Sequence, residues 1–291
     1  MTTSPQSCAE CGYNIPPSSD CCPTCGRPSL FPNVRAASDS REVGALASRY
    51  ASAAERASER GLLDHLQKLQ QAIQQDAIAV ITMDIGELER VARSDQALFI
   101  TYYAAVSGGF RNPGAGFFDA LRGPAEEALF QGYKEKINFA ALALDGNGLR
   151  NYGNTSVTLR TELIAYRASL YESNNVIHTV ITQDLRMGDA ASMPAGHRAT
   201  WDGRDKLVVV KHANHLESEA QMKPDVFATV LLHNGATTRD DDFVEVHIYG
   251  PMSVYTISKV RIARQGNRRL LARIAELRKL LADRGIPLEV T

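Results

Sequence analysis

The stretch DDDFVEVHIYGPMSVYTISKVRI, residues 240–262, decides the expected fold, because it contains two strand-like runs separated by a Gly-Pro turn. Successive side chains of a strand point to opposite faces, so the valines and isoleucine of the first run form one apolar face. The other face carries Phe243, Glu245, His247 and Tyr249. A carboxylate, an imidazole and two aromatic rings on one face predict the wall of a cleft. The alternative is an ordinary amphipathic strand whose polar face meets solvent.

Short strand-like runs recur through residues 77–264, with few helical stretches between them. The expected strands are Ala79–Met83, Asn138–Leu144, Thr155–Arg160, Ala168–Tyr171, Val226–Leu232, Phe243–Tyr249 and Val254–Ile262. The expected helices are Ile85–Arg93 and Phe117–Glu135, whereas Leu207–Val210 fits either a strand or a helix. Because strands and helices do not alternate regularly, the order predicts an α+β domain with a mixed or mostly antiparallel sheet.

Two segments with helical periodicity bracket this middle domain. Within residues 31–76, a linker leads into apolar residues spaced by three and four, and Gly61 marks a kink or a break. Residues 265–291 contain a basic helix with the same spacing, which ends before Gly285 and Pro287. We expect these heptad-like helices to pack within the chain, with a dimer interface as the alternative. The arginines of the last helix are typical of a solvated basic face.

All five cysteines lie between Cys8 and Cys25, so they form one local site. CAECG at residues 8–12 and CPTCG at 22–26 are two CxxC turns, and each ends in a glycine that can adopt positive φ. Four thiolates in this spacing predict a structural zinc site within residues 1–30, held by Cys8, Cys11, Cys22 and Cys25. Cys21 competes with Cys22, but only Cys22 keeps the two-residue spacing to Cys25. This segment resembles zinc-ribbon and rubredoxin-like modules.

Composition limits the classes of function. The 291 residues have 44% hydrophobic and 22% charged side chains, which is enough to bury a core and excludes general disorder. A formal net charge of −1 provides no overall attraction to nucleic acids or acidic membranes. The longest apolar run, residues 97–106, is too short to span a bilayer, and no secretory signal opens the sequence. We therefore expect a cytoplasmic protein without a membrane association.

Common catalytic signatures are absent from the sequence. It has no HExxH or GxSxG motif and no complete dinucleotide fingerprint. Outside the N-terminal segment there is also no thiol. Any chemistry in the α+β domain must therefore use carboxylate, imidazole, hydroxyl or arginine groups, which directs attention to Glu245.

The late strand EVHIYGPMSVYTISKVRI, residues 245–262, resembles the end of ADP-ribosyltransferase-like domains. NYGNTSVTLR at 151–160 and YRASLYESN at 166–174 are similar to stretches of the bacterial toxin and phage-associated members. The resemblance covers about residues 138–262. It departs from the family in lacking an identifiable first-strand Arg or His, and Phe243 stands where arginine-directed enzymes carry Gln or Glu.

The resemblance implies a site that binds NAD as a substrate. Glu245 would hold the 2′-hydroxyl of the nicotinamide ribose and stabilise the oxocarbenium charge, with His247 beside it. Tyr152, Phe243 or Tyr249 would stack on nicotinamide, and Arg150 or Arg160 would meet the pyrophosphate. Ser169 stands where the family's Ser-Thr-Ser strand is expected.

The leading hypothesis is therefore NAD-dependent ADP-ribosyl transfer to a protein or nucleic-acid acceptor, in a toxin or a defence effector. A second hypothesis is a non-enzymatic binding or scaffold protein that uses the zinc ribbon and the helices for contacts. A third is a nucleic-acid-binding protein that uses the ribbon and the arginine-rich tail. Loss of NAD-dependent chemistry on changing Glu245 discriminates the first hypothesis from the other two.

Overall fold

A computed structural model describes residues 6–113, 117–176, 194–216, 224–263 and 268–291. Eight strands form the central sheet. In sheet order they are β12 (Leu288–Val290), β11 (Ile257–Ile262), β5 (Thr155–Leu159), β3 (Ile78–Met83), β4 (Ile137–Ala143), β10 (Glu245–Tyr249), β6 (Ala168–Tyr171) and β7 (Arg198–Thr200). Only the β11–β12 pair among these neighbours is parallel, so the sheet is mixed. The predicted α+β class is confirmed.

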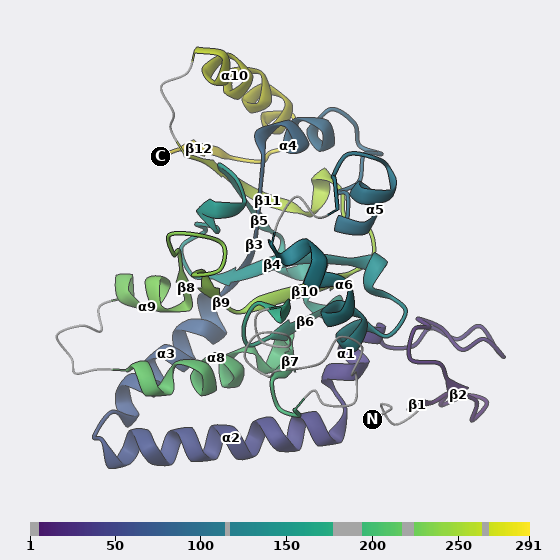
Figure 1. The fold of residues 1–291 in the computed structure, drawn as a ribbon, viewed down its shortest axis with the longest axis vertical. Coiled ribbons are helices and arrows are strands. Elements are labelled where there is room, and N and C mark those ends of the chain that lie inside the picture. Colours follow the sequence, from purple (N-terminus) through teal and green to yellow (C-terminus); the bar gives the residue numbers. More distant parts are fainter. Residues whose placement is uncertain (1–5, 114–116, 177–193, 217–223, 264–267) are drawn as a thin grey trace.

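Helices cover one face of this sheet and share a single apolar core with it (Figure 1). The longer helices that contribute to this core include α2 (Ser40–Glu59), α3 (Leu63–Asp76), α4 (Ile85–Ala92), α8 (Arg204–His212) and α10 (Arg268–Ala282). The predicted N-terminal helical segment breaks between α2 and α3, where Gly61 adopts a φ of 69° that other residues rarely take. The apolar faces of the bracketing helices α2, α3 and α10 are therefore buried within the chain.

The ambiguous run Leu207–Val210 lies in the helix α8. All four of its residues are buried, because α8 packs against both α2 and α3 and belongs to the same core as the sheet. A helix that is buried on every side carries no amphipathic signal, which is why the sequence pattern left it undecided.

The predicted strand Val226–Leu232 is wrong. Most of it belongs to helix α9 (Pro224–Leu231), and only Leu232 enters the short strand β8 (Leu232–His233), which pairs with β9 (Asp242–Phe243). Phe227 and Leu231, four residues apart, are the buried positions of α9, and this spacing is helical. A short apolar run does not distinguish a buried strand from a buried helix, and Pro224 at the first helical position favours the helix.

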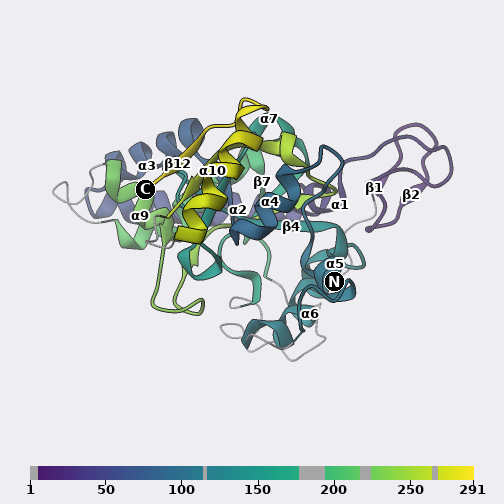
Figure 2. The same ribbon diagram turned by 90° about the horizontal axis from the view of Figure 1, so that it is seen from above.

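Helices α5 (Tyr102–Ser107) and α6 (Phe117–Phe130) lie on the other side of the molecule from α3 and α7 (Thr161–Ile164), as Figure 2 shows. The predicted helix Phe117–Glu135 corresponds to α6, which ends five residues earlier, at Phe130, and a 3-10 turn follows it. Within the described residues, the 3-10 turns are η1 (Lys134–Lys136), η2 (Arg150–Tyr152), η3 (Ala165–Arg167), η6 (Trp201–Gly203), η7 (Ala213–His215) and η9 (Val254–Thr256). The start of the predicted strand Val254–Ile262 is therefore η9, and the strand itself begins at Ile257.

The N-terminal segment forms a small module at one end of the molecule (Figures 1 and 2). Its hairpin consists of β1 (Gln6–Ser7) and β2 (Asn14–Ile15), and the short helix α1 (Pro32–Ala37) lies within the segment that we expected to be a linker. The guanidinium of Arg35 on α1 donates hydrogen bonds to the carbonyls of Pro16, Pro17 and Ser19. These bonds attach the module to the sheet domain.

No helix among the described ranges has both the length and the apolar character that crossing a bilayer requires.

Candidate active site and candidate metal centre

Strand β10 places Glu245 near the middle of the sheet, between β4 and β6. Val246 and Ile248 point into the helix-covered core, as the alternation predicts. Glu245 and His247 lie on the opposite face, where their side chains contact each other. The expectation that this strand carries its polar residues on one face is therefore met by the geometry, but this face is buried rather than solvated.

Two donors hold the carboxylate of Glu245. Its Oε2 accepts the backbone N–H of Asn175 at 3.2 Å and lies 2.9 Å from Nε2 of His247. When the carboxylate is ionised, it is an acceptor only, so Nε2 of His247 carries the proton of this bond. The side chain of Glu245 is 8% exposed, and these bonds limit its choice of rotamer.

Glu245 lines a pocket of about 110 Å³ on this face of the sheet. Polar and aromatic side chains from several other elements line the same pocket. They are Arg122, Phe139, Tyr152, Asn174 and Phe243. A small pocket with aromatic walls and a few convergent polar groups is the usual form of a site for a small planar ligand.

Tyr152 contributes a neutral hydroxyl to this pocket. Burial, followed by the negative charge of Glu245, raises the pKa of Tyr152 to about 12, although a hydrogen bond with the side chain of Asn174 opposes the rise. The phenol therefore keeps its proton at neutral pH and can donate a hydrogen bond to a ligand.

Helix α6 brings to this site two residues, Arg122 and Glu126, that the sequence pattern did not indicate. Nη1 of Arg122 donates to Oε1 of Glu126 at 2.8 Å, and its guanidinium lies over the rings of Tyr102 and Phe139 at 4.5 and 5.2 Å. Burial raises the pKa of Glu126 to about 7 against the opposing effect of Arg122. The spacing of four on the predicted helix was visible in the sequence, but it is also the spacing of an ordinary surface ion pair.

His247 lies behind Glu245 and does not line the pocket. It is 3% exposed and is packed edge-on against Phe130 and Phe139, with ring centroids 4.8 and 5.5 Å away. This packing orients its Nε2 toward Glu245. His247 is thus placed to position the carboxylate rather than to contact a ligand.

The structure does not bring Ser169 or Tyr249 to the pocket. Ser169 pairs across the sheet with His247 and is buried, where Nδ2 of Asn33 donates to its Oγ at 3.2 Å. Tyr249 is four residues beyond Glu245, which is about 13 Å along a strand, and its hydroxyl donates to Asp20 at 3.2 Å. A shared strand face is therefore not the same as a shared site.

Arg150 lines a different pocket, whose volume is about 480 Å³. This larger pocket adjoins the Glu245 pocket at Thr82, which lines both. Its wall also contains Arg261 and the amides Asn147, Asn154 and Asn234. Arg160, in contrast, lines neither pocket and donates from Nε to the carbonyl of Ile257 at 3.0 Å.

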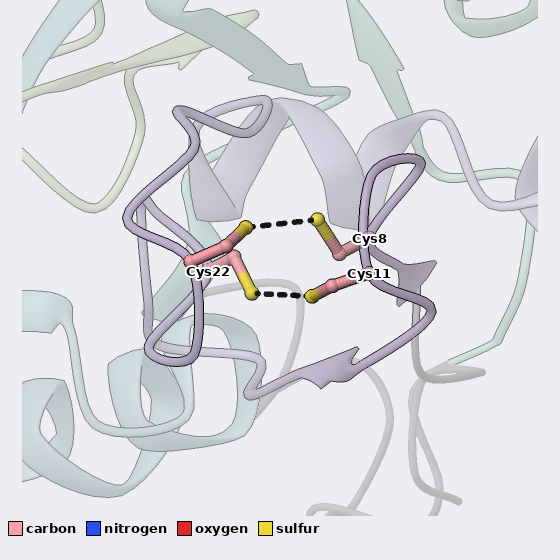
Figure 3. A group of neighbouring side chains, drawn as sticks. Cys8, Cys11 and Cys22 are labelled. Carbon is pink, nitrogen blue, oxygen red and sulfur yellow. Dashed lines mark hydrogen bonds between the residues drawn. The ribbon is translucent and has the colours of Figure 1, made fainter.

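The four cysteines expected to bind metal converge in the N-terminal module. Ligand atoms of Cys8, Cys11, Cys22 and Cys25 all lie within 4.8 Å of one another, and two sulfur pairs are 3.5 and 3.6 Å apart. Figure 3 shows the thiols of Cys8, Cys11 and Cys22 turned toward the space between the two loops. A tetrahedron with metal–sulfur bonds of about 2.3 Å has sulfur–sulfur edges of about 3.8 Å, so these residues could hold a metal ion such as zinc. The cluster contains Cys22 rather than Cys21.

The two loops of this cluster have the same local structure. Gly12 and Gly26 adopt φ values of 69° and 71°, and their N–H groups donate to the carbonyls of Cys8 and Cys22. The positive φ that we expected of these glycines is confirmed. Burial opposes ionisation of Cys22, yet N–H groups of Cys25 and Thr24 and the neighbouring thiols lower its pKa to about 6. Such thiolates are the form that binds metal.

Comparison with known protein families gave no match, and comparison with curated proteins gave no significant match. The resemblance to ADP-ribosyltransferase-like domains therefore depends on the residues quoted above and stays a prediction.

Proposed function

We propose that this protein is an NAD-dependent ADP-ribosyltransferase whose catalytic carboxylate is Glu245. One observation carries the proposal: Glu245 lines a pocket together with a tyrosine, an arginine and two phenylalanine rings. The carboxylate is held by a backbone N–H and by His247, so it does not need to reorganise during a reaction.

The proposed reaction breaks the bond between nicotinamide and C1′ of the ribose. The bonding electron pair leaves with nicotinamide, and positive charge develops on the sugar as an oxocarbenium ion. Glu245 would stabilise this charge while accepting a hydrogen bond from the 2′-hydroxyl. A nucleophile of the acceptor macromolecule then forms the new bond to C1′ and loses a proton to solvent.

The lining of the two pockets supports NAD as the substrate. Phe139 and Phe243 offer aromatic walls to the nicotinamide ring, and the neutral Tyr152 offers a donor to its amide. The larger pocket continues from Thr82 and carries Arg150, which suits the pyrophosphate, together with amides that suit the adenosine half.

Release of nicotinamide from NAD tests this proposal. We expect Glu245→Gln to lower the rate by about a hundredfold or more, because the amide carries no charge to stabilise the oxocarbenium ion. Glu276→Gln is the control, since Glu276 is exposed on α10 and pairs with Arg93 there. Equal release from wild type and Glu245→Gln would overturn the proposal.

Binding gives a second readout that does not need an acceptor. NAD at a hundredfold excess over its dissociation constant should raise the free energy of unfolding by about 2.7 kcal/mol. Toxicity of the wild type on expression in cells, lost in Glu245→Gln, would support the role as a toxin or a defence effector.

For the N-terminal module we infer a structural zinc ion, because four thiolates leave no open coordination position for catalysis. The module projects from one end of the molecule and exposes Tyr13. This observation favours, as a second candidate function, a binding or scaffold role of the module. Nucleic-acid binding by the C-terminal helix has less support, because Arg273 of α10 and Arg284 just after it form ion pairs with Glu89 and Asp95.

A further inference from the structure

At the Glu245 pocket, one arginine is ion-paired with a buried carboxylate and also interacts through its charge with the carboxylate of Glu245. Arg122 is bonded to Glu126 on its own helix and also faces the charge of Glu245 on β10. Glu126 is completely buried, whereas Arg122 and Glu245 line the pocket. The charge of one guanidinium therefore acts both on a carboxylate that a ligand can reach and on a carboxylate that it cannot.

Arg122, Glu126 and Glu245 form a trio of charged residues, and the surrounding aromatic rings confine the guanidinium of Arg122. Its guanidinium lies over the rings of Tyr102 and Phe139, so it has little freedom to move away from the two carboxylates. The titratable and charged groups that face the trio come from several elements. They are Tyr102 and Tyr103 on α5, Lys134 on η1, Tyr152 on η2 and His247 on β10.

The charge of the site depends on Glu126. With Glu126 ionised, Arg122 and Glu126 neutralise each other, and Glu245 leaves the trio with one net negative charge. With Glu126 protonated, the charge of Arg122 cancels that of Glu245. In a pocket of low dielectric constant, this difference of one unit in net charge strongly alters the stability of a nearby cation.

We propose that Glu126 is a positioning residue that occupies Arg122 and thereby keeps the negative charge of Glu245 available to the reaction. This inference rests on the proposed function, because the cation that benefits is the oxocarbenium ion formed from NAD. Glu126 itself is completely buried and acts only through Arg122.

The expected consequence is a pH profile of nicotinamide release that rises through the titration of Glu126. Burial, opposed by Arg122 and reinforced by Glu245, raises the pKa of Glu126 to about 7. The ionised fraction of a group with such a pKa increases about tenfold between pH 6 and pH 8, so we expect a rise in rate of about that size.

Two glutamate variants on the same helix test this. Glu126→Gln removes the charge but keeps the shape of the side chain. Its rate of nicotinamide release should therefore stay at the value that wild type has at low pH, without the rise between pH 6 and pH 8. Glu127→Gln is the matched control, because Glu127 is exposed and pairs with Lys134 at 2.9 Å. A Glu126→Gln protein that keeps the wild-type rise would overturn the inference while leaving the proposed function standing.

A titration of the ¹³C-labelled glutamate carboxyl groups by NMR gives a readout that does not depend on activity or on the folding of Glu126→Gln. In wild type, Glu126 should titrate near pH 7, and Glu245→Gln should lower that midpoint because it removes a neighbouring negative charge. A Glu126 signal that titrates near pH 4, or that Glu245→Gln leaves unmoved, overturns the inference. Absence of nicotinamide release from wild type at every pH overturns the proposed function, and with it the role of Glu126 in the reaction, whether or not the titration shows that Glu126 and Glu245 interact through their charges.

Discussion

At the scale of single residues, the site depends on close approaches that only particular side chains allow. Gly148 brings the loop after β4 down onto the sheet between the two pockets. Its N–H donates to Oγ of Ser156 at 3.0 Å, and the next N–H, of Leu149, donates to Oγ1 of Thr82 at 2.9 Å. Both hydroxyls lie on the face of the sheet that carries Glu245. The loop and the shared wall of the two pockets are therefore held by the same contacts.

We predict that Gly148→Ala destabilises the protein. A Cβ at this position would overlap Oγ1 of Thr82 and lie 3.0 Å from Oγ of Ser156, so the loop must shift. The expected loss in the free energy of unfolding is about 1–3 kcal/mol, measured by urea denaturation.

Gly44→Ala is the control for this prediction. Gly44 lies inside helix α2, and a Cβ there would meet nothing within 4 Å. Alanine has the higher helix propensity, so we expect a gain of roughly 0.5–1 kcal/mol. Equal effects of the two substitutions would show that the contact at Gly148 does not constrain the loop.

At the scale of elements, a network of ion pairs attaches helix α2 to strands β6 and β7 at the edge of the sheet. Nη1 of Arg49 on α2 donates to Glu172 at 2.7 Å, directly after β6, and Nδ1 of His197 lies 2.6 Å from the other oxygen of the same carboxylate. Glu42 on α2 pairs with Arg198 of β7 at 3.0 Å. The two bonds made by α2 connect residues more than 100 positions apart, and they fix the helix against the edge of the sheet.

The pH dependence of stability should report this network through Glu172. Burial disfavours its ionisation, but bonds from His197 and Arg49 outweigh that effect and lower its pKa to about 2. The folded pKa lies below the unfolded value of about 4.3, so the contribution is present above pH 4.3 and is lost as pH falls toward 2.

We therefore predict that Glu172→Gln lowers the free energy of unfolding at pH 7 by an amount on the order of 3 kcal/mol. The difference between wild type and variant should shrink as the pH falls from about 5 to 2. Urea denaturation at several pH values measures it. A difference that stays constant over this range would assign the effect of the substitution to packing rather than to charge.

At the scale of the whole molecule, the N-terminal module and the sheet domain differ in how they are stabilised. The sheet and its helices share one large core, whereas the buried apolar cluster of the module consists of Cys8, Ile15 and Cys22. Segments this small usually need disulfides, a bound metal or association to fold, and the four clustered cysteines could hold a metal. The module nevertheless contacts the strand that carries Glu245, since the hydroxyl of Tyr249 at the end of β10 donates to Asp20.

Metal content should show which of the adjacent residues Cys21 and Cys22 binds the metal. We expect about one zinc ion per chain in wild type and in Cys21→Ser, because Cys21 lies outside the cluster. Cys22→Ser should lose the metal, since it removes one of four ligands. Metal analysis of the purified proteins measures this, and limited proteolysis should show cleavage confined to residues 1–30 after chelation. Retention of metal by Cys22→Ser and its loss by Cys21→Ser would reverse the assignment.

The sequence by itself determined the features that depend on local spacing. Two CxxC turns located the thiol cluster, alternation placed Glu245 and His247 on one face, and the order of strands and helices gave the α+β class. The tertiary structure decided which distant residues meet. Arg122 and Glu126 join Glu245 because α6 lies over that face of the sheet. Ser169 and Tyr249 lie farther along their strands, and Arg150 on η2 lines the adjoining pocket. Periodicity reports which side of its own element a residue occupies, but contacts between elements depend on how the whole core packs.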